Sequence, residues 1–150
     1  ITGKPEEKNM LMNLGASEII YRDDFMSEPV KALDRGIYAG GIDTVGGDIL
    51  AKIISMISNH GAVSCCGNVG GIKFTSSVFP FILRGVSLIG IDSAESILEF
   101  KKNIWNLFAN EWSLNLDTYT RVLPLNDIDN EISRILEGKQ VGRVVIKHEV

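Results

Sequence analysis

The chain contains 150 residues, of which 45% are hydrophobic and 23% are charged, and its formal net charge at pH 7 is −4. This composition is that of a globular protein able to bury a core of its own. The negative charge gives no general attraction to nucleic acid or to an anionic membrane, and no apolar run approaches the ~18 residues of a membrane-spanning helix. We therefore expect neither nucleic acid nor a membrane among its partners.

The cysteines and histidines limit which disulfides and metal sites the chain can form. The only cysteines are Cys65 and Cys66, which are adjacent in an apolar stretch and cannot form an ordinary structural disulfide with each other. We read them as core or strand residues of a protein from a reducing compartment, and we expect a cytoplasmic location. Two neighbouring cysteines and two histidines that are distant from each other do not make a zinc site, and no metal site is predicted.

Apolar runs of strand length alternate with helical patterns along the chain. The expected elements, in chain order, are a helix over 4–14, a strand over 18–21, a turn of helix over 30–33, a strand over 40–45, a helix over 46–59, a strand over 62–66, a short helical or irregular piece over 78–85, a strand over 86–91, a helix over 95–110, a strand over 118–124, a helix from Asn126 or Asp127 to Gly138, and a strand over 143–147. Apolar strands separated by helices indicate a parallel sheet with helices on both faces. The fold class is therefore α/β and Rossmann-type.

The beginning of the chain departs from that fold. A dinucleotide-binding unit opens with a strand, the motif G-x-G-x-x-G and a helix, whereas residues 1–4 read ITGK and run directly into the first helix. We therefore expect a sheet that lacks its first strand and glycine-rich turn, and a chain that is the C-terminal part of a larger enzyme. The character of the sequence changes after about residue 111. The strand–helix–strand pattern that follows either extends the same sheet or packs on a different domain.

Several strings of the sequence carry a family resemblance. They are LGASEII at 14–20, GGIDTVGGDILAK at 40–52, CGNVGG at 66–71, FPFILRGVSLIGIDS at 79–93 and GKQVGRVVIK at 138–147. Together they resemble the medium-chain dehydrogenase/reductase superfamily in its zinc-free quinone oxidoreductase branch, and most of all the acrylyl-CoA reductase type. The resemblance implies a partial NADP-binding Rossmann domain over 1–112, and a segment over 113–150 that returns to a GroES-like catalytic domain.

The end of the second Rossmann strand, at residues 1–3, meets the adenosine ribose of a bound dinucleotide. An acidic residue there binds the ribose 2′-hydroxyl, but this chain has Thr2, Gly3 and Lys4. A hydroxyl, a backbone N–H beside a small residue and a lysine suit a phosphate instead. Together with the family resemblance, they predict NADPH as the cofactor. The plainer alternative is that Thr2 caps the helix and Lys4 is a solvated charge. Arg22 follows the next strand and either reaches the adenine or the 2′-phosphate, or is a surface arginine.

Further cofactor contacts are expected where the later strands end, because ligands bind at the carboxyl ends of parallel strands. The candidates are Val45 and Gly46 after one strand, Asn68 in the glycine-rich turn after the next, Ile91 and Asp92 after the last, and Lys101 and Lys139 as supplementary phosphate contacts. For Asp43 we prefer helix capping or a hydrogen bond at the end of its strand to a role in binding, and for His60 a position at a helix end. No catalytic residue is identified, so the chain by itself is expected to be inactive.

The resemblance implies an NADPH-dependent reductase that transfers hydride to the activated C=C bond of a small-molecule substrate, acrylyl-CoA or a quinone. An alternative of another class is a non-catalytic binding or regulatory module that keeps a dinucleotide fold. A methyltransferase-like domain is disfavoured, because such a domain would have an acid where Thr-Gly-Lys stands. The resemblance also implies a homodimer in which the edge strand over 86–91 pairs with its two-fold mate.

Overall fold

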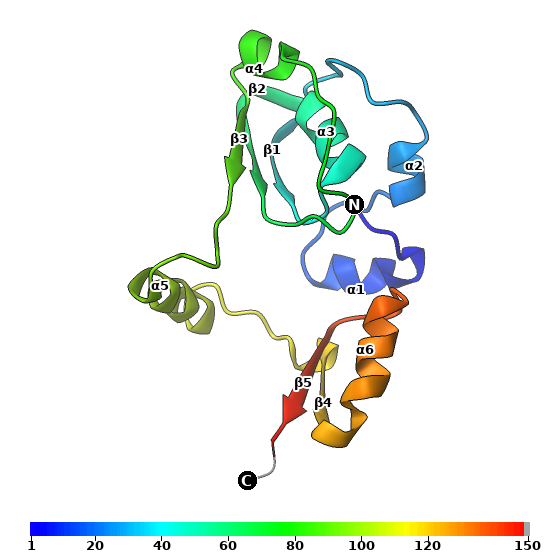
Figure 1. The fold of residues 1–150 in the computed structure, drawn as a ribbon, viewed down its shortest axis with the longest axis vertical. Coiled ribbons are helices and arrows are strands. Elements are labelled where there is room, and N and C mark those ends of the chain that lie inside the picture. The colour runs from blue at the N-terminus through cyan, green and yellow to red at the C-terminus, as the bar shows by residue number, and fades with distance from the viewer. Residues whose placement is uncertain (149–150) are drawn as a thin grey trace. The chain divides into compact units, whose positions relative to one another are not determined.

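The computed structural model describes residues 1–148, and the chain divides into two compact units, 1–95 and 96–150, which are described separately. The elements in chain order are η1 (Pro5–Glu7), α1 (Lys8–Asn13), α2 (Arg22–Met26), β1 (Tyr38–Asp43), α3 (Gly47–Ser55), β2 (Ile57–Cys65), α4 (Phe79–Arg84), β3 (Ser87–Gly90), α5 (Leu98–Ala109), η2 (Asp117–Tyr119), β4 (Thr120–Pro124), η3 (Leu125–Asp127), α6 (Ile128–Leu136) and β5 (Arg143–Lys147) (Figure 1). The η elements are 3-10 helices. No helix within residues 1–148 is long and apolar enough to cross a membrane.

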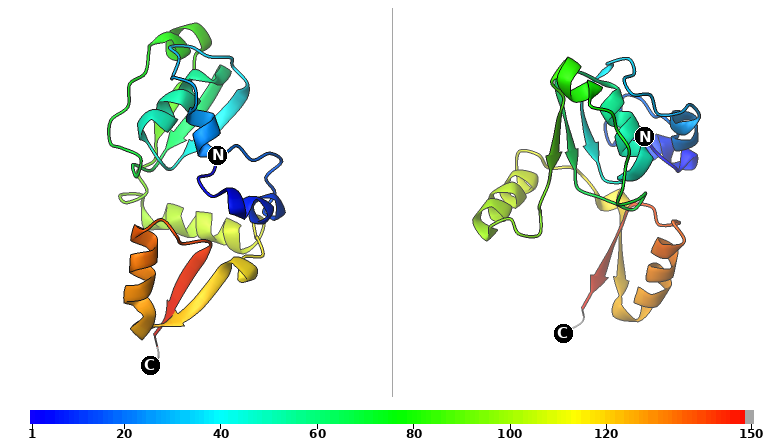
Figure 2. Two further views of the ribbon diagram at one scale, coloured as in Figure 1. Left: turned by 90° about the vertical axis from the view of Figure 1, so that its right-hand side faces the viewer. Right: turned by 45° about the horizontal axis from the view of Figure 1, so that its top comes forward.

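The first unit is built on a parallel sheet. Its three strands lie in the order β1-β2-β3, and α3 packs on one face of them (Figures 1 and 2). The core consists of apolar side chains from these elements, namely Leu50, Ile54, Ile57, Val63 and Val86. Burying each such side chain stabilises the fold by about 1.5–3 kcal/mol. The prediction of an α/β fold with parallel strands and intervening helices is confirmed.

Two local predictions in the first unit are wrong. Residues 18–21 form no strand, because their only ladder contact is an isolated parallel bridge between Thr2 and Tyr21. Residues 30–33 are not helical; the short helix of this region is α2, where Asp23 and Asp24 favour the positive end of the helix.

The junction between α3 and β2 also differs from the prediction. The helix ends at Ser55 and the strand begins at Ile57, so the residues over 57–59 that were assigned to a helix are extended. His60 therefore lies within a strand and not at a helix end. Its φ of 62° accompanies a shift in register between β1 and β2, which is the local kink expected of a β-bulge.

The second unit contains α5 and a strand–helix–strand segment. Strands β4 and β5 pair in parallel, with α6 between them in the chain, in a two-stranded sheet of their own. Among the described residues this segment therefore does not extend the first sheet. The buried Glu131 of α6 accepts a hydrogen bond of 2.6 Å from Arg121 of β4, which neutralises its charge. The boundary predicted between residues 112 and 113 remains a prediction.

Candidate functional site

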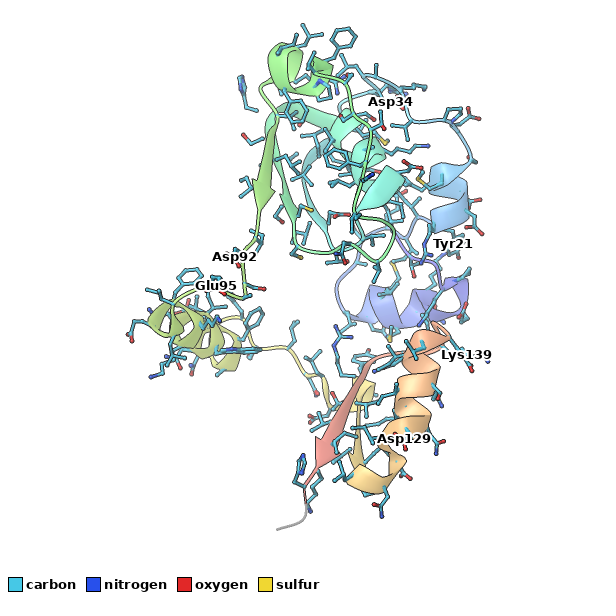
Figure 3. The ribbon with its side chains drawn as sticks, in the orientation of Figure 1. Tyr21, Asp34, Asp92, Glu95, Asp129 and Lys139 are labelled. Atoms are coloured by element: carbon cyan, nitrogen blue, oxygen red, sulfur yellow. The ribbon has the colours of Figure 1, made fainter. Side chains whose placement is uncertain are left out.

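The three strands of the first unit end at the same level. In the parallel register Asp43 lies opposite Cys65, and Cys65 lies opposite Gly90. The segments that follow β2 and β3 enclose an open cleft of about 520 Å³, lined by Cys65, Cys66, Gly67, Asn68, Gly90, Ile91 and Asp92. Figure 3 shows Asp92 just beyond the end of β3. The structure therefore brings Asn68, Ile91 and Asp92 together at one cleft, in the part of an α/β sheet where ligands bind.

The turns after β1 and β2 pack against each other backbone to backbone. Gly46 and Gly71 form a parallel bridge, and the N–H of Gly70 donates to the carbonyl of Val45 at 2.7 Å. A Cβ added at Gly46 would lie 2.6 Å from the carbonyl oxygen of Gly71, and one at Gly67 would collide with the carbonyl of Thr44. Side chains at these positions would force the two turns apart, so only glycine permits this approach.

Asp43 holds the first of these turns. Its side chain is buried, with 2% of its surface exposed. The carboxylate accepts hydrogen bonds from the N–H of Val45 at 3.3 Å and from the N–H of Gly46 at 3.0 and 3.1 Å. Of the two structural roles preferred for Asp43, the hydrogen bond at the end of its strand is confirmed, whereas α3 has no side-chain cap. Because these donors are partial positive charges, they compensate for burying the carboxylate.

The two cysteines lie beside Asp43, and Cys65 also packs against the core. The Cys65 thiol donates to the carboxylate of Asp43 at 3.6 Å, and the Cys66 thiol donates to its carbonyl at 3.4 Å. Both are free. The expectation of core or strand residues is confirmed for Cys65, the half-buried last residue of β2, and is wrong for Cys66, which follows the strand and is exposed. Burial, followed by the hydrogen bond to Asp43, raises the pKa of Cys65, which keeps its thiol protonated as a donor. Their position directly before Gly67, at a strand end, is the signal that sequence reasoning overlooked.

Three of the four residues predicted to bind the 2′-phosphate are adjacent in the chain, and the fourth is brought to them by backbone hydrogen bonds. The N–H of Arg22 donates to the carbonyl of Thr2 at 2.7 Å. The guanidinium of Arg22 lies so close to Gly3 that a Cβ there would collide with it. The backbone N–H of Lys4 donates to the hydroxyl of Thr2 at 3.1 Å. Because neither η1 nor α1 has a side-chain cap, the alternative that Thr2 caps the helix is wrong.

A second, smaller cavity connects this cluster to the end of β1. It has a volume of about 150 Å³ and is lined by Ile1, Arg22, Ile42, Asp43, Thr44, Val45, Ile49 and Ile53. Arg22 and Val45 thus face one space, although 22 residues separate them in the sequence. Asp43 is on the wall of this cavity, and through Cys65 it contacts the wall of the larger cleft.

The remaining candidates, Lys101 and Lys139, belong to the second unit. Lys101 is a half-buried residue of α5. Lys139 follows α6 (Figure 3). It forms an ion pair of 2.8 Å with Glu137. Because both charges of that pair are exposed, the pair contributes little to stability. The contact of either lysine with a cofactor remains a prediction. Within residues 1–148 no cluster of three or more His, Cys, Asp or Glu side chains is arranged to hold a metal ion.

Sequence comparison identifies relatives of the chain. No family model matches it. It is 36% identical over 148 residues to YhfP of Bacillus subtilis, which is named "Putative quinone oxidoreductase". It is 34% identical over 147 residues to AcuI of Ruegeria pomeroyi, which is named as an acrylyl-CoA reductase. These alignments cover 97% of the chain but only 45% and 44% of the relatives. The chain therefore spans less than half the length of the curated relatives it matches.

Solved structures agree with this result. The crystal structure of YhfP with NAD bound matches 97% of the chain and 45% of its own length, with a TM-score of 0.91 at 36% identity. The YhdH oxidoreductase from Salmonella enterica in complex with NADP matches 99% of the chain and 45% of its own length, with a TM-score of 0.92 at 30% identity. These matches confirm the Rossmann-type fold.

Proposed function

Since the chain is related to the quinone oxidoreductases and acrylyl-CoA reductases of the medium-chain dehydrogenase/reductase superfamily, we propose that it forms the cofactor-binding portion of an NADPH-dependent oxidoreductase. One observation carries this proposal: the glycine turns after β1 and β2 pack directly against each other beside a cleft at the strand ends. A backbone without side chains at such a place permits the close approach of a dinucleotide. The crystal structures of YhfP with NAD and of YhdH with NADP support the same conclusion.

The cluster at the start of the chain favours NADPH over NADH. Arg22 supplies a permanent positive charge beside Gly3, and the residues over 2–4 supply a hydroxyl and a lysine. A guanidinium and an ammonium bind a phosphate through charge-assisted hydrogen bonds. None of these side chains is an acid that would repel the 2′-phosphate of NADPH. The complex of YhdH with NADP agrees with this preference.

The cleft residues are proposed to hold the other end of the cofactor. Asn68 offers an amide for ribose hydroxyls, while Ile91 and Asp92 border the same cleft with backbone and side-chain groups. When bound, the reduced nicotinamide supplies the hydride, and the protein contributes binding and orientation. The proposed acceptor is the activated C=C bond of acrylyl-CoA or of a quinone-like compound, without zinc. The free cysteines are consistent with the proposed cytoplasmic location.

Binding and turnover test this proposal. We refer to the longest natural polypeptide that contains this sequence as the full-length protein. It should bind NADPH with a micromolar or lower Kd in calorimetry, and it should consume NADPH, followed at 340 nm, when acrylyl-CoA or a quinone is added. Consumption with neither compound, despite tight binding, would favour the non-catalytic module. Absence of binding to both NADPH and NADH would overturn the proposal.

We also propose a homodimer through the free edge of β3. This strand lies at the edge of the described sheet, and its apolar residues Leu88 and Ile89 are partly exposed. The N–H of Ile91 donates to the carbonyl of Cys65 in β2 at 3.0 Å. Because amide groups alternate in direction along a strand, the N–H of Leu88 points away from β2 and is free to pair with another strand.

Replacing Leu88 by proline should therefore weaken the dimer. Proline removes the outward N–H without removing a bond to β2. We expect the dimer dissociation constant of the full-length protein to rise at least about tenfold in sedimentation equilibrium, as the loss of paired edge hydrogen bonds implies. Leu88→Ala, which keeps the amide, is the control and should dimerise almost normally. A monomeric parent protein, or an unchanged dimer of the proline variant, would show that this edge is not the interface.

A further inference from the structure

The buried carboxylate of Asp43 lies between the two cavities of the candidate site. On one side it borders the smaller cavity that Arg22 and Val45 also line. On the other it accepts a hydrogen bond from the thiol of Cys65, which lines the larger cleft. One side chain thus contacts the walls of both spaces. Its main chain adds a further connection, since the N–H of Cys66 donates to the Asp43 carbonyl at 2.9 Å.

The carboxylate also determines where the turn after β1 can lie. It binds the N–H groups of Val45 and Gly46, and these two residues then contact the turn after β2. The carbonyl of Val45 accepts from the N–H of Gly70, and Gly46 forms the bridge with Gly71. A chain of direct contacts therefore runs from the Asp43 carboxylate through residues 45–46 to residues 70–71.

We propose that Asp43 is a positioning residue that locks the turn after β1 to the turn after β2, and that this lock gives the dinucleotide site its shape. The inference rests on the proposed function and deepens it. Asp43 itself makes no contact with substrate or cofactor in this account. It acts through the backbone of Val45 and Gly46, which fixes the position of the Gly67–Gly71 turn and of Asn68 within it. A displaced turn loses contacts with the cofactor while the hydride step is unchanged.

A purely structural role for Asp43 makes a different prediction. A carboxylate that only stabilises the fold would, when replaced, lower the unfolding temperature of the protein and leave the affinity of the folded protein for its cofactor unchanged. A positioning residue changes that affinity at temperatures far below unfolding. The two roles are therefore separated by a binding measurement on folded protein, together with the division of the effect between KM and kcat.

The test replaces Asp43 in the full-length protein. Asp43→Asn keeps the shape of the side chain but replaces one acceptor oxygen with an NH2 group facing the N–H of Gly46. We expect the Kd for NADPH, measured by calorimetry, to rise at least about tenfold and kcat to change less than about threefold. Amide hydrogen exchange of peptides covering 45–46 and 70–71 should become faster together. Asp48→Asn, in the exposed first turn of α3, is the matched control and should leave all three measurements unchanged.

A second variant tests the same lock without touching the carboxylate. A Cβ at Gly70 would lie 2.8 Å from Cγ1 of Val45, so Gly70→Ala pushes the two turns apart from the exposed side. It should raise the Kd for NADPH with kcat retained, as Asp43→Asn does. If both substitutions break the same contact, the Kd of the double variant for NADPH should rise clearly less than the product of the two single fold-increases in Kd. Gly70→Ala alone decides the question if Asp43→Asn does not fold.

The outcomes separate this inference from the proposed function. If the parent protein binds NADPH and both folded variants keep its Kd, Asp43 has no positioning role and the proposed function stands. Fully multiplicative effects in the double variant also overturn the lock, because they show two independent contacts. If the parent protein binds neither NADPH nor NADH, the proposed function fails and this inference fails with it. A weakened and coupled Kd in both variants supports the inference.

Discussion

Lys4→Ala should raise the KM of the full-length protein for NADPH about 10- to 100-fold and change the KM for NADH less than about twofold. A charge-assisted hydrogen bond to a phosphate contributes about 1.5–3 kcal/mol, which corresponds to this range. NADH lacks the 2′-phosphate, so it loses nothing when the ammonium is removed. The backbone N–H of Lys4 donates to the Thr2 hydroxyl at 3.1 Å, and Lys4 directly follows Gly3, beside which the guanidinium of Arg22 lies.

The control for this prediction is Lys8→Ala. Lys8 is an exposed lysine at the beginning of α1, so its replacement makes the same change in net charge close by. It should alter neither KM by more than about twofold, and raising the salt concentration should reduce the effect of Lys4→Ala but not create one for Lys8→Ala. Equal losses for NADPH and NADH in Lys4→Ala would refute the assignment of the phosphate site to this cluster.

The main strands of the first unit were predictable because their side chains are apolar at strand length. The prediction failed where the structure of a segment depends on pairing with another strand, or where a helix and a strand compete for the same residues. Residues 18–21 have a strand-like composition, but a strand also needs a neighbour, and only the bridge from Thr2 to Tyr21 is formed. Ile57 continues the helical spacing of α3, yet it begins β2 and is fully buried in the core. Hydrophobic period alone cannot separate these alternatives at a helix–strand junction.

The candidate site was predictable to the extent that it depends on position at strand ends. Asn68, Ile91 and Asp92 line one cleft as the fold class implied, and Asp43 makes the expected hydrogen bonds. The contact of Gly3 with Arg22 was not visible in the sequence, because it depends on how two distant backbone segments pair. Charged side chains that donate hydrogen bonds to distant backbone carbonyl groups cannot be recognised from the sequence either. Lys52 is an example: it is buried, donates to the carbonyl of Glu28 at 2.8 Å and lies over the ring of Phe25.

Arg84 is a second residue of this kind, and its loss should strongly destabilise the first unit. Its guanidinium donates to the carbonyl of Ser55 at 3.1 Å and to that of Ile57 at 2.9 Å, and it also donates to the carbonyl of Asp34. It thereby joins the end of α3, the start of β2 and the segment that leads to β1. Replacement by methionine keeps the apolar stem but removes the charged donor from three carbonyl groups, of which that of Ser55 still accepts from the N–H of Asp34 at 3.0 Å.

We expect Arg84→Met to lower the free energy of unfolding of the first unit by about 2–4 kcal/mol, because hydrogen bonds from a charged donor contribute about 1.5–3 kcal/mol each and this side chain is only half-buried. Arg84→Lys should recover part of the loss, since an ammonium cannot reproduce the planar fork. Both tryptophans, Trp105 and Trp112, belong to the second unit, so tryptophan fluorescence would not report on this change. Hydrogen exchange of peptides from α3 and β2 would report on it directly. The control is Arg35→Met, which removes a neighbouring exposed arginine and should leave the exchange of these peptides unchanged. Equal exchange rates in the Arg84→Met and Arg35→Met variants would disprove the role of Arg84.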